Sequence, residues 1–96
     1  MSFDEETIQQ VWEKGAVAPP NDPNLWRKDA AKAWIYREKY GNRDSKWGWE
    51  IDHKDPGGGD DLSNLQPLQW QNNVGKQKGR LDPVVTSKGV ENVELD

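Results

Sequence analysis

Apolar residues near the start of the chain recur at helical spacing. Ile8, Val11 and Trp12 fall on one side of a helix over about residues 4–14, and acidic residues occupy its first turn, where they suit the helix dipole. Residues 16–23 contain three prolines and therefore favour a loop. The pattern predicts a short amphipathic helix followed by a loop.

A second apolar pattern at helical spacing comes next. It predicts a helix that begins near Leu25, with Asn24 as a candidate N-cap, and that closes at residues 40–42. Four residues fit one face of this helix: Trp26, Ala30, Ala33 and Trp34.

From residue 47 the period changes to two. Trp47, Trp49 and Ile51 alternate with Gly or acidic residues, which predicts a half-buried strand ending at Asp52 and His53. Since neighbouring side chains on a strand point to opposite faces, those last two would share a site only if the backbone turns at the strand end.

The rest of the chain reads as an open loop, a returning strand, a helix and a hairpin. Residues 56–61 are rich in glycine and aspartate, and residues 62–68 are short enough for a second strand, interrupted at Pro67. A helix is expected over about 70–79. Residues 84–86 and 90–95 flank Ser-Lys-Gly and predict a β-hairpin. We therefore expect a single α+β domain over residues 1–96.

Composition adds two constraints. The chain has 96 residues and only 32% hydrophobic residues, but six Trp, two Tyr and one Phe concentrate apolar area in large rings. At this size a bound metal is a candidate for additional stabilisation. With no cysteine, such a metal would be held by oxygen and imidazole ligands. Most of the tryptophans are expected in the core, with Trp70 the one we expect to be exposed near a substrate.

The chain has no apolar run as long as a membrane span, and its acidic first residues do not resemble a signal peptide. We expect a cytoplasmic protein. The net charge of −4 argues against a nucleic-acid partner by itself, but the charge is unevenly distributed. Residues 23–46 carry seven basic residues against three acids, and residues 67–80 carry three basic residues and no acid. The first run is equally consistent with phosphate contact and with a solvated helix face.

His53 is the only histidine, and it follows Asp52 directly. Hydrolysis of a phosphodiester needs an activated water and neutralisation of phosphate charge, which a base and a hard cation supply together. With an ordinary pKa of about 6.5, a histidine is suited to take a proton from water near neutral pH. His53 is therefore the candidate base and Asp52 the candidate metal ligand, although a lone histidine is more often structural.

Residues 49–79, WEIDHKDPGGGDDLSNLQPLQWQNNVGKQKG, resemble the HNH endonuclease family in the order of their features. The resemblance implies a ββα-metal core at about residues 47–80, with residues 81–96 as a tail. By position it implies His53 as the base, Asp52 and Asn73 as metal ligands, Asn64 as the brace of the loop, and Lys76 as a phosphate-neutralising cation. A shift of one residue would exchange Asn73 for Asn72. The cysteine pairs that bind a structural zinc in many members of the family are absent here. We expect aromatic packing to stabilise the fold in place of that zinc.

The resemblance implies hydrolysis of DNA, with RNA not excluded. A single site of this kind nicks one strand, so double-strand cutting would need a homodimer or a larger nuclease complex. Oxygen ligands favour Mg²⁺, with Mn²⁺ as a substitute. Two alternatives stay open: a ββα module that binds nucleic acid or protein without cutting, and a nuclease subunit whose DNA affinity comes from a partner.

Overall fold

The computed structural model describes residues 3–95. In it, helix α1 (Glu5–Trp12) lies within the segment where the sequence predicts a helix. The side chain of Asp4 caps it by accepting a 2.8 Å hydrogen bond from the backbone N–H of Thr7. Ile8, Val11 and Trp12 are buried. The amphipathic pattern of this segment was therefore interpreted correctly.

The predicted second helix is wrong. In its place β1 (Trp26–Lys28) and β2 (Trp34–Tyr36) form an antiparallel hairpin, followed by the short 3-10 helix η1 (Arg37–Lys39). Two features explain the difference. Asp29 accepts hydrogen bonds from the backbone N–H groups two and four residues ahead, which closes a turn, and β2 consists of residues that favour strands.

The hairpin of β3 (Trp49–His53) and β4 (Leu65–Gln69) forms the centre of the fold. Its register pairs Asp52 with Gln66 and His53 with Leu65, so the ladder continues to the last residue of β3. The 3-10 helix η2 (Leu62–Asn64) leads into β4. The two strands expected in this region are confirmed, and the strand break expected at Pro67 is wrong because β4 continues through it.

Helix α2 (Trp70–Val74) follows β4 directly and is shorter than the helix expected over residues 70–79. Gly75 ends it, and a tight turn follows in which Gly79 has a φ of +80°. The hairpin expected in the tail is confirmed as β5 (Val85–Lys88) and β6 (Glu91–Glu94). Asn92 fastens this hairpin to the body of the protein by hydrogen bonds to the backbone of Trp34.

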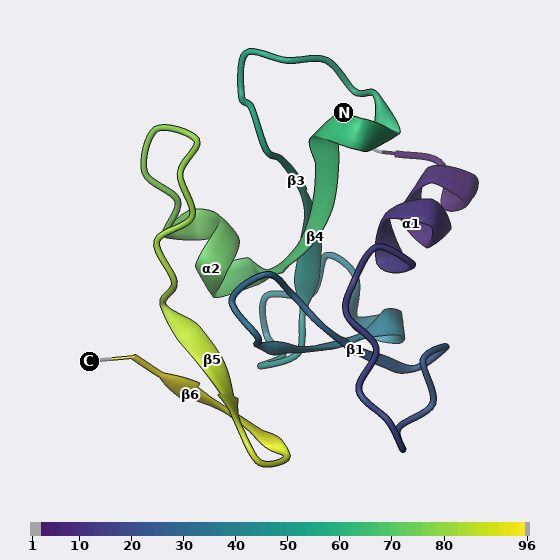
Figure 1. The fold of residues 1–96 in the computed structure, drawn as a ribbon, viewed down its shortest axis with the longest axis vertical. Helices are drawn as coiled ribbons and strands as arrows, with labels where there is room; N and C mark the ends of the chain where they lie inside the picture. Colours follow the sequence, from purple (N-terminus) through teal and green to yellow (C-terminus); the bar gives the residue numbers. More distant parts are fainter. Residues whose placement is uncertain (1–2, 96) are drawn as a thin grey trace.

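Helices α1 and α2 lie on opposite sides of the β3–β4 hairpin (Figure 1). The core lies on the α1 side, where the rings of Trp12 and Trp49 are 5.3 Å apart. A second aromatic group packs around Trp26, whose ring lies within 6.0 Å of those of Trp34, Tyr36 and Trp47. The aromatic core expected from the composition is therefore present, and the architecture is α+β. None of the helices within residues 3–95 is long and apolar enough to cross a membrane.

A buried polar network supplements the aromatic packing. The Asp29 carboxylate accepts hydrogen bonds from the Gln69 backbone N–H at 2.9 Å and from the Asn72 side chain at 3.0 Å. The Asn72 oxygen in turn accepts from the N–H groups of Val84 and Val85. The network joins the β1–β2 turn, the end of β4, the start of α2 and the start of β5.

Candidate functional site

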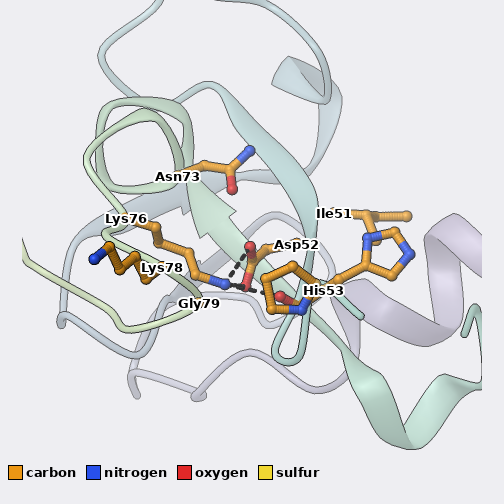
Figure 2. A pocket seen from close by; sticks show the side chains of 8 residues that line it. Ile51, Asp52, His53, Asn73, Lys76, Lys78 and Gly79 are labelled. Carbon is orange, nitrogen blue, oxygen red and sulfur yellow. Dashed lines mark hydrogen bonds and ion pairs between the residues drawn. The ribbon is translucent and has the colours of Figure 1, made fainter. Parts of the chain in front are cut away.

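An open polar pocket of about 470 Å³ lies between the end of β3, helix α2 and the turn that follows α2. Asp52 and His53 border it from the hairpin, Asn73 from the helix, and Lys76 and Lys78 from the turn. Figure 2 shows the side chains of Asp52, Asn73 and Lys76 pointing toward one another. Four of the five site residues expected from the sequence therefore line this pocket, and the side chains of three of them face one another.

The ammonium group of Lys76 is surrounded by oxygen atoms in this pocket. The Lys76 Nζ donates to both carboxylate oxygens of Asp52, at 2.7 and 2.9 Å, and to the backbone oxygen of His53 at 2.8 Å. Gln66 also donates to Asp52 Oδ2, at 2.8 Å. Both charged side chains are over nine-tenths buried. The pocket is thus a place where a positive charge is well solvated by the protein.

The two adjacent asparagines have different surroundings. Asn72 is fully buried in the network with Asp29, so all its hydrogen-bonding groups are used for structure. Asn73 lies at the pocket, and its Nδ2 donates to Glu50 Oε1 at 2.8 Å. The oxygen of the Asn73 amide lies on the side of Asp52 (Figure 2). Of the two candidates that the sequence left open, Asn73 is the one beside Asp52.

The imidazole of His53 is not brought together with Asp52 and Asn73. Because β3 stays regular to its end, adjacent side chains point to opposite faces, and the imidazole points toward Ile51 and the α1 side (Figure 2). There its Nε2 lies 2.6 Å from Asp60 Oδ1, and its ring centroid is 6.2 Å from that of Phe3. The turn of the backbone that would bring both side chains to one site is absent, because the β3–β4 ladder continues to His53.

Asn64 braces the loop between β3 and β4, as expected. Its side-chain oxygen accepts from the Asp55 N–H at 3.0 Å, and its Nδ2 donates to the carbonyls of Asp55 and Gly59. Gly58 packs so closely that a Cβ there would lie 2.8 Å from Asn64 Nδ2. Its hydrogen bonds are to Asp55 and Gly59, in the same loop that carries Asp60, the partner of His53.

Sequence reasoning missed Glu50 and Asp60. Glu50 shares the face of Asp52 because the two residues are two apart on β3, a signal available in the strand pattern. Arg43 binds Glu50 through two hydrogen bonds of 2.7 and 3.0 Å and lowers the pKa of this carboxyl below 4.5. Asp60 is in the loop, and only the folded loop brings it to His53.

The basic run of residues 23–46 is not one face of a helix, because this segment contains the β1–β2 hairpin. Three of its arginines bind the protein itself: Arg27 holds backbone carbonyls, Arg37 contacts Gln9 and Glu5, and Arg43 contacts Glu50. Trp70, expected to be exposed, is half-buried, and its Nε1 donates to Ser45 O at 2.9 Å.

The donor set at the pocket suits a hard cation. Over residues 3–95 there is no group of three or more His, Asp or Glu side chains placed to hold a metal. The pocket offers instead one carboxylate, the amide oxygen of Asn73 and the carbonyl of His53, all of which are ligand types that Mg²⁺ and Mn²⁺ accept alongside water. Two of these groups, the Asp52 carboxylate and the His53 carbonyl, already hold the Lys76 ammonium.

The chain was compared with family models, with curated proteins and with solved structures, and none of the three comparisons found a match. The fold and the site define a small α+β protein with a polar pocket beside a central hairpin.

Proposed function

We propose that the protein is a metal-dependent endonuclease of the ββα-metal (HNH) type that hydrolyses phosphodiester bonds in DNA. The observation that carries the proposal is the convergence of Asp52, Asn73 and a cationic group on one pocket between a β-hairpin and the helix that follows it. These residues also occur in the order that the resemblance of residues 49–79 implies.

In this proposal Asp52 and Asn73 would hold one Mg²⁺ or Mn²⁺ ion. The bound ion supplies neutralisation of phosphate charge and polarises the scissile group. Lys76 then exchanges its ion pair with Asp52 for a phosphate oxygen of the substrate. A lysine can make this exchange because its ammonium is a compact charge on a flexible stem.

His53 is the proposed general base. A neutral imidazole has one unprotonated ring nitrogen, which is available to take a proton from water. For this the imidazole has to reach the Asp52 face, so the proposal includes a turn of the last residue of β3 and loss of the His53–Asp60 bond. Asn64, which shapes the loop, sets how far this movement extends.

A non-catalytic module that binds nucleic acid or a partner protein is the second candidate. Two observations favour it: the Asp52 carboxylate already has a buried cation as its partner, and the imidazole lies on the opposite face of the strand. A protein of this kind would need neither the metal nor the histidine movement.

Plasmid nicking tests the two candidates. We expect supercoiled DNA to become nicked in Mg²⁺ or Mn²⁺, no nicking in EDTA, and a loss of about 10²- to 10⁴-fold in rate for His53→Ala, the range typical of a removed general base. Asp52→Asn should abolish the metal-dependent nicking, and the exposed Asp82→Asn serves as the matched control.

Metal-dependent nicking that survives His53→Ala would refute the assigned base. Salt-dependent DNA binding by protein that stays uncleaving through long incubation with Mn²⁺ would favour the binding module.

A further inference from the structure

The amide of Asn73 is held in one orientation. Its Nδ2 donates to Glu50 Oε1 at 2.8 Å. An ionised carboxylate can only accept hydrogen bonds, so the NH₂ group of the amide must face Glu50 and the amide oxygen must face the other way. That other side is the pocket, where the Asp52 carboxylate lies (Figure 2).

Glu50 is itself fixed. Arg43 Nε donates to Glu50 Oε2 at 2.7 Å and Arg43 Nη2 donates to Glu50 Oε1 at 3.0 Å. The Arg43–Glu50 contact is a salt bridge in which both carboxylate oxygens are held. The Glu50 side chain is only 19% exposed, so little solvent competes for the Asn73 amide.

We infer that Glu50 is a positioning residue, which presents the Asn73 oxygen to the pocket and thereby sets the affinity of the pocket for a divalent cation. The inference rests on the proposed metal-dependent function. It identifies Glu50 as the hydrogen-bond partner that holds the metal ligand Asn73 in place. Hydrogen-bond partners behind metal ligands typically change metal affinity by about 10- to 100-fold when removed.

Mn²⁺ titration of the protein without DNA, followed by calorimetry, tests the inference. Glu50→Gln presents an amide that both donates and accepts, so the Asn73 amide is free to turn over. We expect the Kd for Mn²⁺ to rise by about tenfold or more. Glu91→Gln, an exposed acid on β6, is the control for the loss of one negative charge.

Glu50→Asp separates orientation from charge. The aspartate keeps the negative charge but is one methylene shorter, and therefore does not reach both Arg43 and Asn73. If orientation controls affinity, this variant should weaken Mn²⁺ binding about as much as Glu50→Gln does. Wild-type affinity in Glu50→Asp with weak binding in Glu50→Gln would mean that charge alone matters, and would overturn the inference.

The double variant Glu50→Gln/Asn73→Asp provides the rescue. It has the same net charge as the wild type, and a carboxylate at position 73 has two equivalent oxygens, so no orientation is needed. We expect Mn²⁺ affinity at least equal to that of the wild type. In the metal-free proteins, NMR of the Asn73 side-chain amide should show one hydrogen-bonded NH₂ environment in the wild type, exchange between two orientations in Glu50→Gln, and loss of the hydrogen bond in Glu50→Asp, with the remaining spectrum conserved.

The failures are distinguishable. Equal Mn²⁺ affinity in all variants would overturn the role of Glu50 while leaving the nuclease proposal intact. No Mn²⁺ binding by the wild type would overturn both, and an amide that is still pinned to Glu50 by NMR would then indicate a structural bond only.

Discussion

Two adjacent asparagines show how differently the fold uses one residue type. Asn72 satisfies the N–H groups of Val84 and Val85 and donates to Asp29, all in buried surroundings, whereas Asn73 is half-buried at the pocket. A buried group left without its partner costs about 1–3 kcal/mol.

We therefore expect Asn72→Ala to lower the free energy of unfolding by about 3 kcal/mol or more, and Asn73→Ala to lower it by less than about 1 kcal/mol. Urea denaturation of both variants measures this. Similar losses for the two would contradict the division of roles, and the nicking assay should show the reverse order, with Asn73→Ala the more damaging.

Lys76 offers a second prediction at the scale of a residue. Removing one partner of a buried ion pair leaves an uncompensated charge and costs about 3–5 kcal/mol. In EDTA, Lys76→Met should therefore be less stable than the wild type by about that amount, because Asp52 loses the ammonium 2.7 Å away.

Mn²⁺ should stabilise Lys76→Met more than it stabilises the wild type, since the ion no longer competes with the ammonium for Asp52. The melting temperature with and without Mn²⁺ measures this difference. Lys88→Met, an exposed lysine on β5, is the control. Equal stabilisation of both proteins would mean that Lys76 and the metal do not compete.

At the scale of elements, the β1–β2 turn depends on a buried acid. Burial raises the pKa of Asp29 above its ordinary 3.8, against the lowering effect of its hydrogen bonds from Asn72, Gln69, Ala33 and Ala31. A raised pKa in the folded state means that the folded protein holds this proton more tightly. The stability linked to Asp29 is then full below pH 3.8 and is lost as the pH rises through the raised pKa.

Urea denaturation between pH 4 and 7 checks the sign. The stability of the wild type relative to Asp29→Asn should decrease as the pH rises, because the variant has no carboxyl to ionise at this position. The exposed Asp44→Asn provides the control. A relative stability that increases with pH would show that the hydrogen bonds outweigh burial and lower the pKa.

The elements differ in how well local pattern predicts them. Helix α1 and the strand β3 were recognised from the sequence because one face of each meets the core and the period is continuous. The β1–β2 hairpin was not, because the spacing of Trp26, Ala30, Ala33 and Trp34 imitates a helical face. The side chain of Asp29 closes a turn in the middle of it, and its partners on β4 and α2 lie some 40 residues away in sequence.

At the scale of the whole molecule, charge placement matters more than the total of −4. Several basic side chains of the N-terminal half are bound internally, whereas Lys78 and Arg80 extend from the turn beside the pocket and form no salt bridge within residues 3–95. These two are the residues best placed to contact a nucleic-acid backbone near the site.

Lys78→Gln/Arg80→Gln should weaken DNA binding measured in EDTA and reduce the slope of log K against log salt concentration by about 1.8, since each phosphate contact contributes about 0.9. Fluorescence anisotropy at several salt concentrations measures both quantities. Lys46→Gln/Lys88→Gln removes the same charge from exposed positions outside the pocket. An equal effect of the two double variants would indicate that only net charge is sensed.

By itself, the sequence determined the amphipathic first helix, the central strand pair, the C-terminal hairpin and the identity of the polar residues around residues 52–76. These are local consequences of spacing and turn chemistry. Only the tertiary structure decided that Asn73 and not Asn72 lies beside Asp52, that Lys76 fills the space between the oxygens, that Glu50 orients the amide, and that the imidazole of His53 lies on the other face. The reason is physical: the direction of a side chain depends on how far a strand ladder continues and on which distant groups satisfy its hydrogen bonds, and neither is written in the local pattern.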